Sequence, residues 1–264
     1  MPLVNQGNIF SWPSRSQAPP AVAAGRGLPQ RPGRLLLPAG LLLVCLLLFG
    51  GLGRAAPDFD LMAQLADQRF GLEGRRAVIE WRDFLADAAE LAPAEQLGAV
   101  NEFFNRRISF GDDIDIWGQV DYWATPMETL GMRRGDCEDF AIAKYVSLKL
   151  LGLPAEKLRL IYVRARIGGS YSQVSQAHMV LSYYPTPTSE PLILDNLISE
   201  IRPAGQRPDL LPVFSFNLES LWVGDASAPA AEATARLSRW RDVVQRMRDE
   251  GLASLVKKEA PAES

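Results

Sequence analysis

An uncharged apolar run of 18 residues, Leu35–Leu52, separates a short N-terminal segment from the rest of this 264-residue chain. Apolar runs of this length are typical of export signals and membrane anchors. The small residues of Gly53–Ala56 favour a cleavable signal. We therefore expect residues 1–34 to form a disordered basic leader and residues 35–56 to be a signal peptide or a membrane anchor. Either way, the remainder of the chain is expected to be exported.

The chain from Pro57 onward contains 208 residues, which is the size of one domain. It holds all 31 acidic residues but only 23 of the 28 basic ones, so its net charge is about −8. Such a body is a poor match for nucleic acid, whose phosphates require a basic surface, and we expect no nucleic-acid partner. It is better suited to binding a hard divalent cation.

Hydrophobic periodicity divides this body into a helical first half and a strand-rich second half, which indicates the α+β class. Helices are predicted over residues 59–70, 75–91 and 94–107, and strands of an antiparallel meander over residues 158–167, 177–184 and 191–197. The composition changes after Gly224. We therefore expect one domain over residues 57–224, followed by a peripheral linker and an amphipathic C-terminal helix within residues 225–264.

Cys137 is the only cysteine outside the apolar run. An exported domain with one thiol cannot form an internal disulfide, so the thiol is either a buried small hydrophobe or a reactive group. Asp136 is a typical helix N-cap, and the apolar stretch behind it predicts a largely buried helix from Cys137 to Leu151. The N–H groups at a helix N-terminus favour a thiolate, which makes Cys137 a candidate nucleophile.

Three acidic residues, Asp136, Glu138 and Asp139, surround this cysteine. Carboxylates close to a thiol oppose its ionisation, so an active thiolate needs a compensating positive charge. Three carboxylates within four residues suit Ca²⁺, and we predict a calcium site next to the nucleophile. Plain helix N-capping by acidic residues is the alternative interpretation. Further carboxylates that could supply ligands lie upstream, at Asp112, Asp113, Asp115 and Asp121.

The chain contains a single histidine, His178, in the second predicted strand. An imidazole is the base and proton donor that a catalytic cysteine requires. Asp195 lies in the next predicted strand, where an unpaired carboxylate among apolar residues would be costly. If the two strands pair, Asp195 can orient the imidazole, which gives a candidate triad of Cys137, His178 and Asp195.

Four segments around these residues resemble the bacterial transglutaminase-like cysteine proteinases. They read WGQVDYWATP, GDCEDFA, QAHMV and LDNL, at residues 117–126, 135–141, 176–180 and 194–197. The resemblance extends over about residues 58–224, and GDCEDFA is its most specific part. It implies a papain-like, transglutaminase-like α+β fold, in which a central helix carries the cysteine at its start and packs on an antiparallel sheet.

By this resemblance Cys137 is the nucleophile, His178 the general base and acid, and Asp195 the orienting acid. The resemblance also implies calcium dependence through the acidic residues beside the cysteine. Proteases of this kind cut a large biofilm adhesin near its N-terminus and so release it from the cell surface. An inner-membrane receptor for cyclic di-GMP sequesters them. The expected function is therefore that of a calcium-dependent periplasmic cysteine endopeptidase, with such an adhesin as substrate and such a receptor as partner.

Two other functions are compatible with the same residues. A protein-crosslinking transglutaminase forms the same acyl-thioester and transfers it to an amine. A membrane-tethered binding module would retain the fold with an inert thiol. The second donor of the oxyanion hole, besides the Cys137 N–H, is open between Gln119 and Trp123.

Overall fold

The computed structural model describes residues 56–168, 172–224 and 228–255. The predicted leader and the apolar run lie outside these residues, and the expectations for them remain predictions. Within the described ranges, no helix has both the length and the hydropathy needed to cross a bilayer.

Two long helices form the first half of the domain. Helix α2 spans Phe59–Ala88 and helix α3 spans Pro93–Arg107. The helix predicted over residues 59–70 lies within α2, and the helix predicted over residues 75–91 coincides with α2 as far as Ala88. Gly71 marks the break between them, since its φ of 70° is a left-handed conformation that glycine adopts without strain.

Helix α6, Cys137–Leu150, is the buried centre of the domain, and all of its residues from Glu138 to Leu148 are buried. The indole of Trp81 on α2 donates a hydrogen bond of 2.9 Å to the hydroxyl of Ser147 on α6. The predicted N-cap is confirmed. Asp136 caps α6, and the capping box that begins at Thr125 starts the short helix α5, Pro126–Met132.

Six antiparallel strands form the main sheet, in the order β6-β5-β4-β3-β7-β8. Their bounds are β3 Leu158–Arg166, β4 Ser175–Tyr183, β5 Leu192–Leu194, β6 Arg202–Pro203, β7 Leu210–Phe216 and β8 Leu221–Val223. The predicted meander is confirmed for β3, β4 and β5. Strand β7 is not among the predicted strands, and it contains Pro212, a residue that is unfavourable within a strand. Pro212 lies opposite Val163, beside an irregularity in the β3–β7 register. The missing N–H of a proline is tolerated at such a position.

Short elements connect the helices to the sheet. They are β1 Ser109–Phe110, α4 Asp113–Trp117, β2 Arg134–Gly135, η1 Ala155–Lys157 and η2 Ala204–Gln206. Strands β1 and β2 pair in parallel, with Phe110 opposite Gly135, and the Gly111 N–H donates to the Gly135 carbonyl at 3.0 Å. This pairing brings the start of α4 next to the start of α6, although the two are more than twenty residues apart in the sequence.

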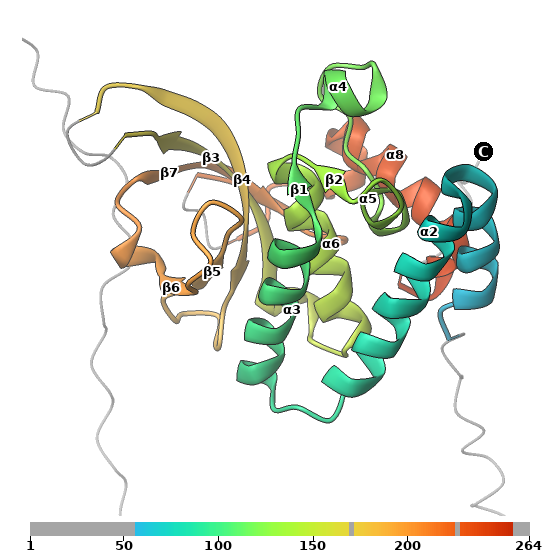
Figure 1. Ribbon diagram of the computed structural model, residues 1–264. Helices are drawn as coiled ribbons and strands as arrows, with labels where there is room; N and C mark the ends of the chain where they lie inside the picture. The colour runs from blue at the N-terminus through green and yellow to red at the C-terminus, as the bar shows by residue number, and fades with distance from the viewer. Residues whose placement is uncertain (1–55, 169–171, 225–227, 256–264) are drawn as a thin grey trace, which may run out of the picture. The chain divides into compact units, whose positions relative to one another are not determined.

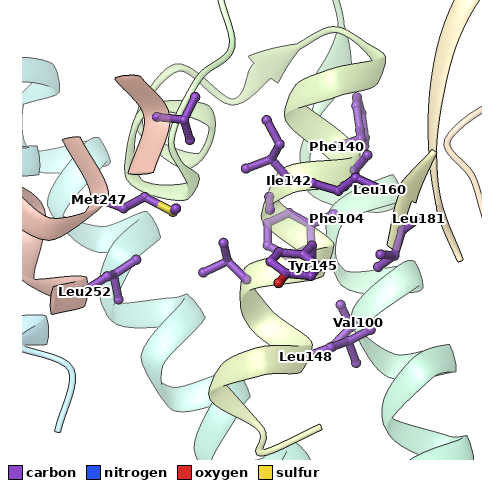
Figure 2. Packing of buried hydrophobic residues seen from close by; sticks show 14 of the residues in the cluster. Val100, Phe104, Phe140, Ile142, Tyr145, Leu148, Leu160, Leu181, Met247 and Leu252 are labelled. Carbon is purple, nitrogen blue, oxygen red and sulfur yellow. The ribbon is translucent and has the colours of Figure 1, made fainter. Parts of the chain in front are cut away.

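The main core lies between the sheet and the helices, and α6 runs between the sheet and α2 (Figure 1). Figure 2 shows side chains of several elements meeting there, among them Val100, Phe104, Tyr145, Leu148, Leu181 and Met247. Because α6 is enclosed by these layers, the position of its N-terminus is fixed by the core.

The C-terminal helix α8, Ser238–Met247, is part of this core, which corrects the expectation that it is peripheral. Its buried residues are Trp240, Val243, Val244 and Met247. The Trp240 ring meets Phe216 of β7 edge-on, with 5.2 Å between centroids. The amphipathic pattern was predicted correctly, but the place where its apolar face is buried depends on the tertiary structure. Shorter helical segments flank α8, at α7 Ala233–Arg236, η3 Arg248–Leu252 and η4 Ala253–Leu255.

Candidate active site

Cys137 is the first residue of α6, directly behind the N-cap Asp136. The Asp136 carboxylate accepts a hydrogen bond of 3.2 Å from the Glu138 N–H, and the Asp139 carboxylate accepts one of 3.3 Å from the Asp136 N–H. Gly135 leaves room for this closed turn, because a Cβ there would lie 2.7 Å from Oδ2 of Asp139. The local sequence therefore fixes the backbone that presents the thiol.

The thiol lies in an acidic environment. Its sulfur donates to Oε2 of Glu138 at 2.7 Å. The backbone N–H of Met179, the residue after His178 on β4, acts in the opposite direction and lowers the pKa of the thiol. Burial and the negative charges of Glu138 and Asp136 raise the pKa of the Cys137 thiol. A reactive thiolate in this position therefore requires positive charge from another source.

His178 and Asp195 form a buried pair, with 2.8 Å between Nε2 and Oδ1. Asp195 directly follows β5, and the antiparallel pairing of β4 with β5 brings the two residues together. Nδ1 is the ring nitrogen left to exchange a proton with Cys137. Within the described residues, no hydrogen bond joins the thiol to His178. In cysteine and serine enzymes such contacts commonly tighten only when substrate binds.

Arg207 holds the other oxygen of Asp195. This guanidinium is 2% exposed and donates to Oδ2 of Asp195 at 2.8 Å. It also binds Asp209 at 2.8 Å. Burial alone would raise the pKa of Asp195, but His178, the Leu197 N–H and Arg207 together lower it to about 2. Asp195 is therefore ionised at neutral pH, as a residue that orients a histidine must be.

The backbone carbonyl of Asp195 is held as well. It accepts hydrogen bonds from Lys144 at 3.1 Å and from Asn105 at 2.9 Å. Sequence reasoning missed Arg207, Lys144 and Asn105 as parts of the site. For Lys144 a signal existed, because a lysine within a buried apolar helix needs a polar partner. Arg207 lies in a loop without periodicity, so no comparable signal marks it.

Three carboxylates gather beside the thiol. One oxygen from each of Asp113, Asp136 and Asp139 lies within 4.8 Å of the other two, and we call these residues the acidic cluster. Burial and repulsion between neighbouring carboxylates raise the pKa of Asp113 to about 7 and that of Asp136 to about 8, and the pKa of Asp139 is raised well above its usual value. Oδ1 of Asp113 is buried without a hydrogen-bond partner. Negative and unsatisfied oxygen donors of this kind fit a calcium ion.

The acidic cluster differs in one member from the predicted calcium ligands. Asp136 and Asp139 belong to it, but Glu138 lies on the thiol side, in a second group with Asp136 and Cys137. Asp113 takes its place, brought there by the β1–β2 pairing. The three other upstream candidates are exposed, namely Asp112, Asp115 and Asp121.

The two candidates for the second oxyanion donor lie in different surroundings. Trp123 is buried, its ring stacks on Phe216 with 5.6 Å between centroids, and its indole N–H donates to Oδ1 of Asp121 at 3.0 Å. Gln119 is exposed. The indole N–H of Trp123 therefore already has a hydrogen-bond partner.

Comparison with known proteins identifies the class of protein. The family model of the bacterial transglutaminase-like cysteine proteinases matches residues 84–208. The chain belongs to this family, and it is a cysteine protease with a transglutaminase-like fold.

Solved structures of Legionella pneumophila LapG match the chain at 39% sequence identity. An EGTA-treated form has a TM-score of 0.63, with 73% of this chain and 100% of that chain covered. A second structure has a TM-score of 0.60, with 73% and 99% covered. A calcium-bound form has a TM-score of 0.59, with 72% and 98% covered. No curated protein matches the chain.

Proposed function

We propose that the chain is a calcium-dependent endopeptidase in which Cys137, His178 and Asp195 form the catalytic triad. The observation that carries this proposal is the buried His178–Asp195 pair, because His178 directly precedes Met179, whose backbone N–H lowers the pKa of the Cys137 thiol. Because Nε2 of His178 binds Asp195, Nδ1 takes the proton of the Cys137 thiol. The sulfur attacks the scissile carbonyl, His178 protonates the leaving amine, and water hydrolyses the acyl-thioester. The Cys137 N–H and Gln119 stabilise the oxyanion.

Asp113, Asp136 and Asp139 would hold the calcium ion. When bound, the ion supplies positive charge that offsets the carboxylates around the thiol. The pKa of Cys137 is raised in part by Glu138 and Asp136, so a cation beside these groups favours the thiolate. The calcium-bound form of LapG supports this assignment.

The substrate we infer is a large cell-surface adhesin, cut near its N-terminus and thereby released. The partner we infer is an inner-membrane receptor for cyclic di-GMP that sequesters the protease, and the location is the periplasm. Family membership and the apolar run Leu35–Leu52 support these inferences.

The rate of Cys137 alkylation by iodoacetamide against pH tests the triad and the metal together, on the full chain with calcium or with a chelator. Because Cys45 also carries a thiol, the Cys137→Ala variant supplies the background rate. We expect a thiolate pKa well below about 8.5 with calcium, a higher pKa with chelator, and loss of the low-pKa reaction in His178→Ala. An ordinary pKa of the Cys137 thiol in every condition would contradict the triad. A low pKa that is the same with calcium and with chelator would contradict the calcium site.

Cleavage of the N-terminal fragment of a candidate adhesin tests the reaction itself. We expect Cys137→Ala to abolish cleavage while its circular dichroism spectrum stays that of the wild type. Cleavage retained by this variant would rule out Cys137 as the nucleophile. Incorporation of a labelled amine into the substrate, in place of hydrolysis, would favour the transglutaminase alternative.

A further inference from the structure

Four consecutive residues, Asp121–Ala124, lie between the acidic cluster and the C-terminal helix α8. We call this segment the strap. Its backbone includes Asp121, whose φ of 60° is unusual for a residue other than glycine. Such a conformation persists only where surrounding contacts hold it, and the strap has contacts on both sides.

The N–H groups of the strap face the acidic cluster. The Tyr122 N–H donates to Oδ2 of Asp113 at 2.5 Å, and the Ala124 N–H donates to Oδ1 of Asp139 at 2.7 Å. Each of these carboxylates is buried. The strap therefore fixes the direction of two of the three carboxylates that would bind calcium.

The carbonyl groups of the strap face α8. Nε of Arg239 donates to the Asp121 carbonyl at 2.8 Å, and Nη2 of the same side chain pairs with the Asp121 carboxylate at 2.8 Å. Nη2 of Arg246 donates to the Trp123 carbonyl at 2.6 Å. The Arg246 guanidinium also lies over the ring of Tyr122, 4.7 Å from its centroid. Two arginines thus hold three successive residues of the strap.

Helix α8 is a firm support for these arginines. The Trp240 indole donates to the Asn217 carbonyl at 3.0 Å, and the apolar face of the helix lies in the core. Arg246 also pairs with Glu128 of α5, whose buried carboxylate is shared with Arg69 on α2 at 2.5 Å. The guanidinium of Arg246 is therefore fixed by its ion pair with Glu128 as well as by its contacts with the strap.

We propose that Arg239 and Arg246 are positioning residues for the calcium site, which they support through the strap. This proposal rests on the proposed calcium function and adds that the C-terminal helix, outside the residues matched by the family model, sets the affinity for the ion. The arginines touch neither substrate nor metal. They act by holding the backbone whose N–H groups direct Asp113 and Asp139, in the manner of groups that orient metal ligands from behind.

Calorimetric titration of the full chain with calcium tests the proposal, using Arg246→Gln and Arg239→Gln. We expect Arg246→Gln to weaken calcium binding by about 10- to 100-fold, as is usual when a group behind a metal ligand is lost. Arg239→Gln is expected to have a smaller effect, because its side chain is 51% exposed. Arg241→Gln is the matched control on the same helix, since Arg241 donates instead to the Thr234 carbonyl, and it should bind as the wild type does.

Amide hydrogen exchange at Tyr122 and Ala124, measured with chelator, provides a readout that does not depend on the metal. We expect faster exchange at both amides in Arg239→Gln and Arg246→Gln and unchanged exchange in Arg241→Gln. If both Arg239→Gln and Arg246→Gln bind calcium with the wild-type affinity and exchange these amides at the wild-type rate, this proposal is overturned and the calcium function is left intact. A wild-type chain that binds no calcium would overturn the calcium function and this proposal with it. Should Arg246→Gln fail to fold, the exposed Arg239→Gln still decides between these outcomes.

Discussion

Asp195 and the carboxylates of the acidic cluster differ in how their negative charge is compensated. Asp195 has a cation of the protein at 2.8 Å, Arg207, and its pKa is lowered to about 2. The acidic cluster has no comparable cation among the described residues, and the pKa values of Asp113 and Asp136 are raised to about 7 and 8. The same residue type is thus ionised in one place and disfavoured as an anion in the other.

This difference indicates what each group is for. A carboxylate that orients a histidine must be charged at all times, so the fold supplies its cation permanently. A group of carboxylates that binds a metal is left uncompensated, and the ion supplies the missing charge. The contrast therefore supports a regulatory cation beside Cys137 and a permanent one beside Asp195.

The largest effect on stability is expected from removing Arg207, the cation beside Asp195. Arg207→Met leaves Asp195 buried with one counter-charge fewer, and breaking a buried ion pair in this way costs about 3–5 kcal/mol in the free energy of unfolding. Urea denaturation measures this loss. Arg202→Met is the control, because Arg202 is a nearby exposed residue paired with Glu200, and exposed pairs contribute at most about 1 kcal/mol. A similar, small loss of unfolding free energy in Arg207→Met and Arg202→Met would show that Arg207 does not compensate a costly buried charge.

A smaller effect of opposite character is expected in the acidic cluster. With chelator, Asp113→Asn should be more stable than the wild type, since one source of repulsion is removed. Calcium at 100 times its Kd should stabilise the wild type by about 2.7 kcal/mol, and the variant should lose most of this gain. Thermal unfolding with and without calcium measures both effects. Asp112→Asn changes the exposed neighbouring carboxylate and should behave as the wild type. If Asp113→Asn retains the full calcium stabilisation, Asp113 is not a ligand.

The smallest effect is a difference in pH dependence. Asp113 and Asp136 have folded pKa values above the ordinary value of about 4, so with chelator their contribution to stability is best below about pH 4 and is lost as the pH rises through 7 to 8. Asp195 has a folded pKa of about 2, so its contribution is present above about pH 4 and is lost as the pH falls towards 2.

Urea denaturation across this pH range, with chelator, measures both the loss of stability at rising pH and the loss at falling pH. Asp113→Asn should flatten the loss of stability between about pH 4 and pH 8 and leave the loss at acid pH unchanged. A wild-type stability that rises between pH 5 and pH 8 in chelator would contradict the raised pKa values of the cluster.

Several features of the site could be predicted because their causes are local. Asp136 caps a helix whose first residue is Cys137, and both the cap and the apolar stretch behind it are visible within fifteen residues of sequence. Alternating patterns likewise located β3 and β4, with His178 on the latter. The cost of burying Asp195 without a partner pointed correctly to a pairing with His178.

The sequence by itself determined the thiol, its helix, the histidine, the α+β class and the acidic character of the site. Only the tertiary structure decided which charges meet. Arg207 reaches Asp195 from a loop, Asp113 reaches the cluster through a two-residue parallel strand pair, and α8 reaches the strap across more than a hundred residues. The physical reason is that capping and periodicity act within a few residues. Buried charge compensation depends on distances in space that no local pattern records.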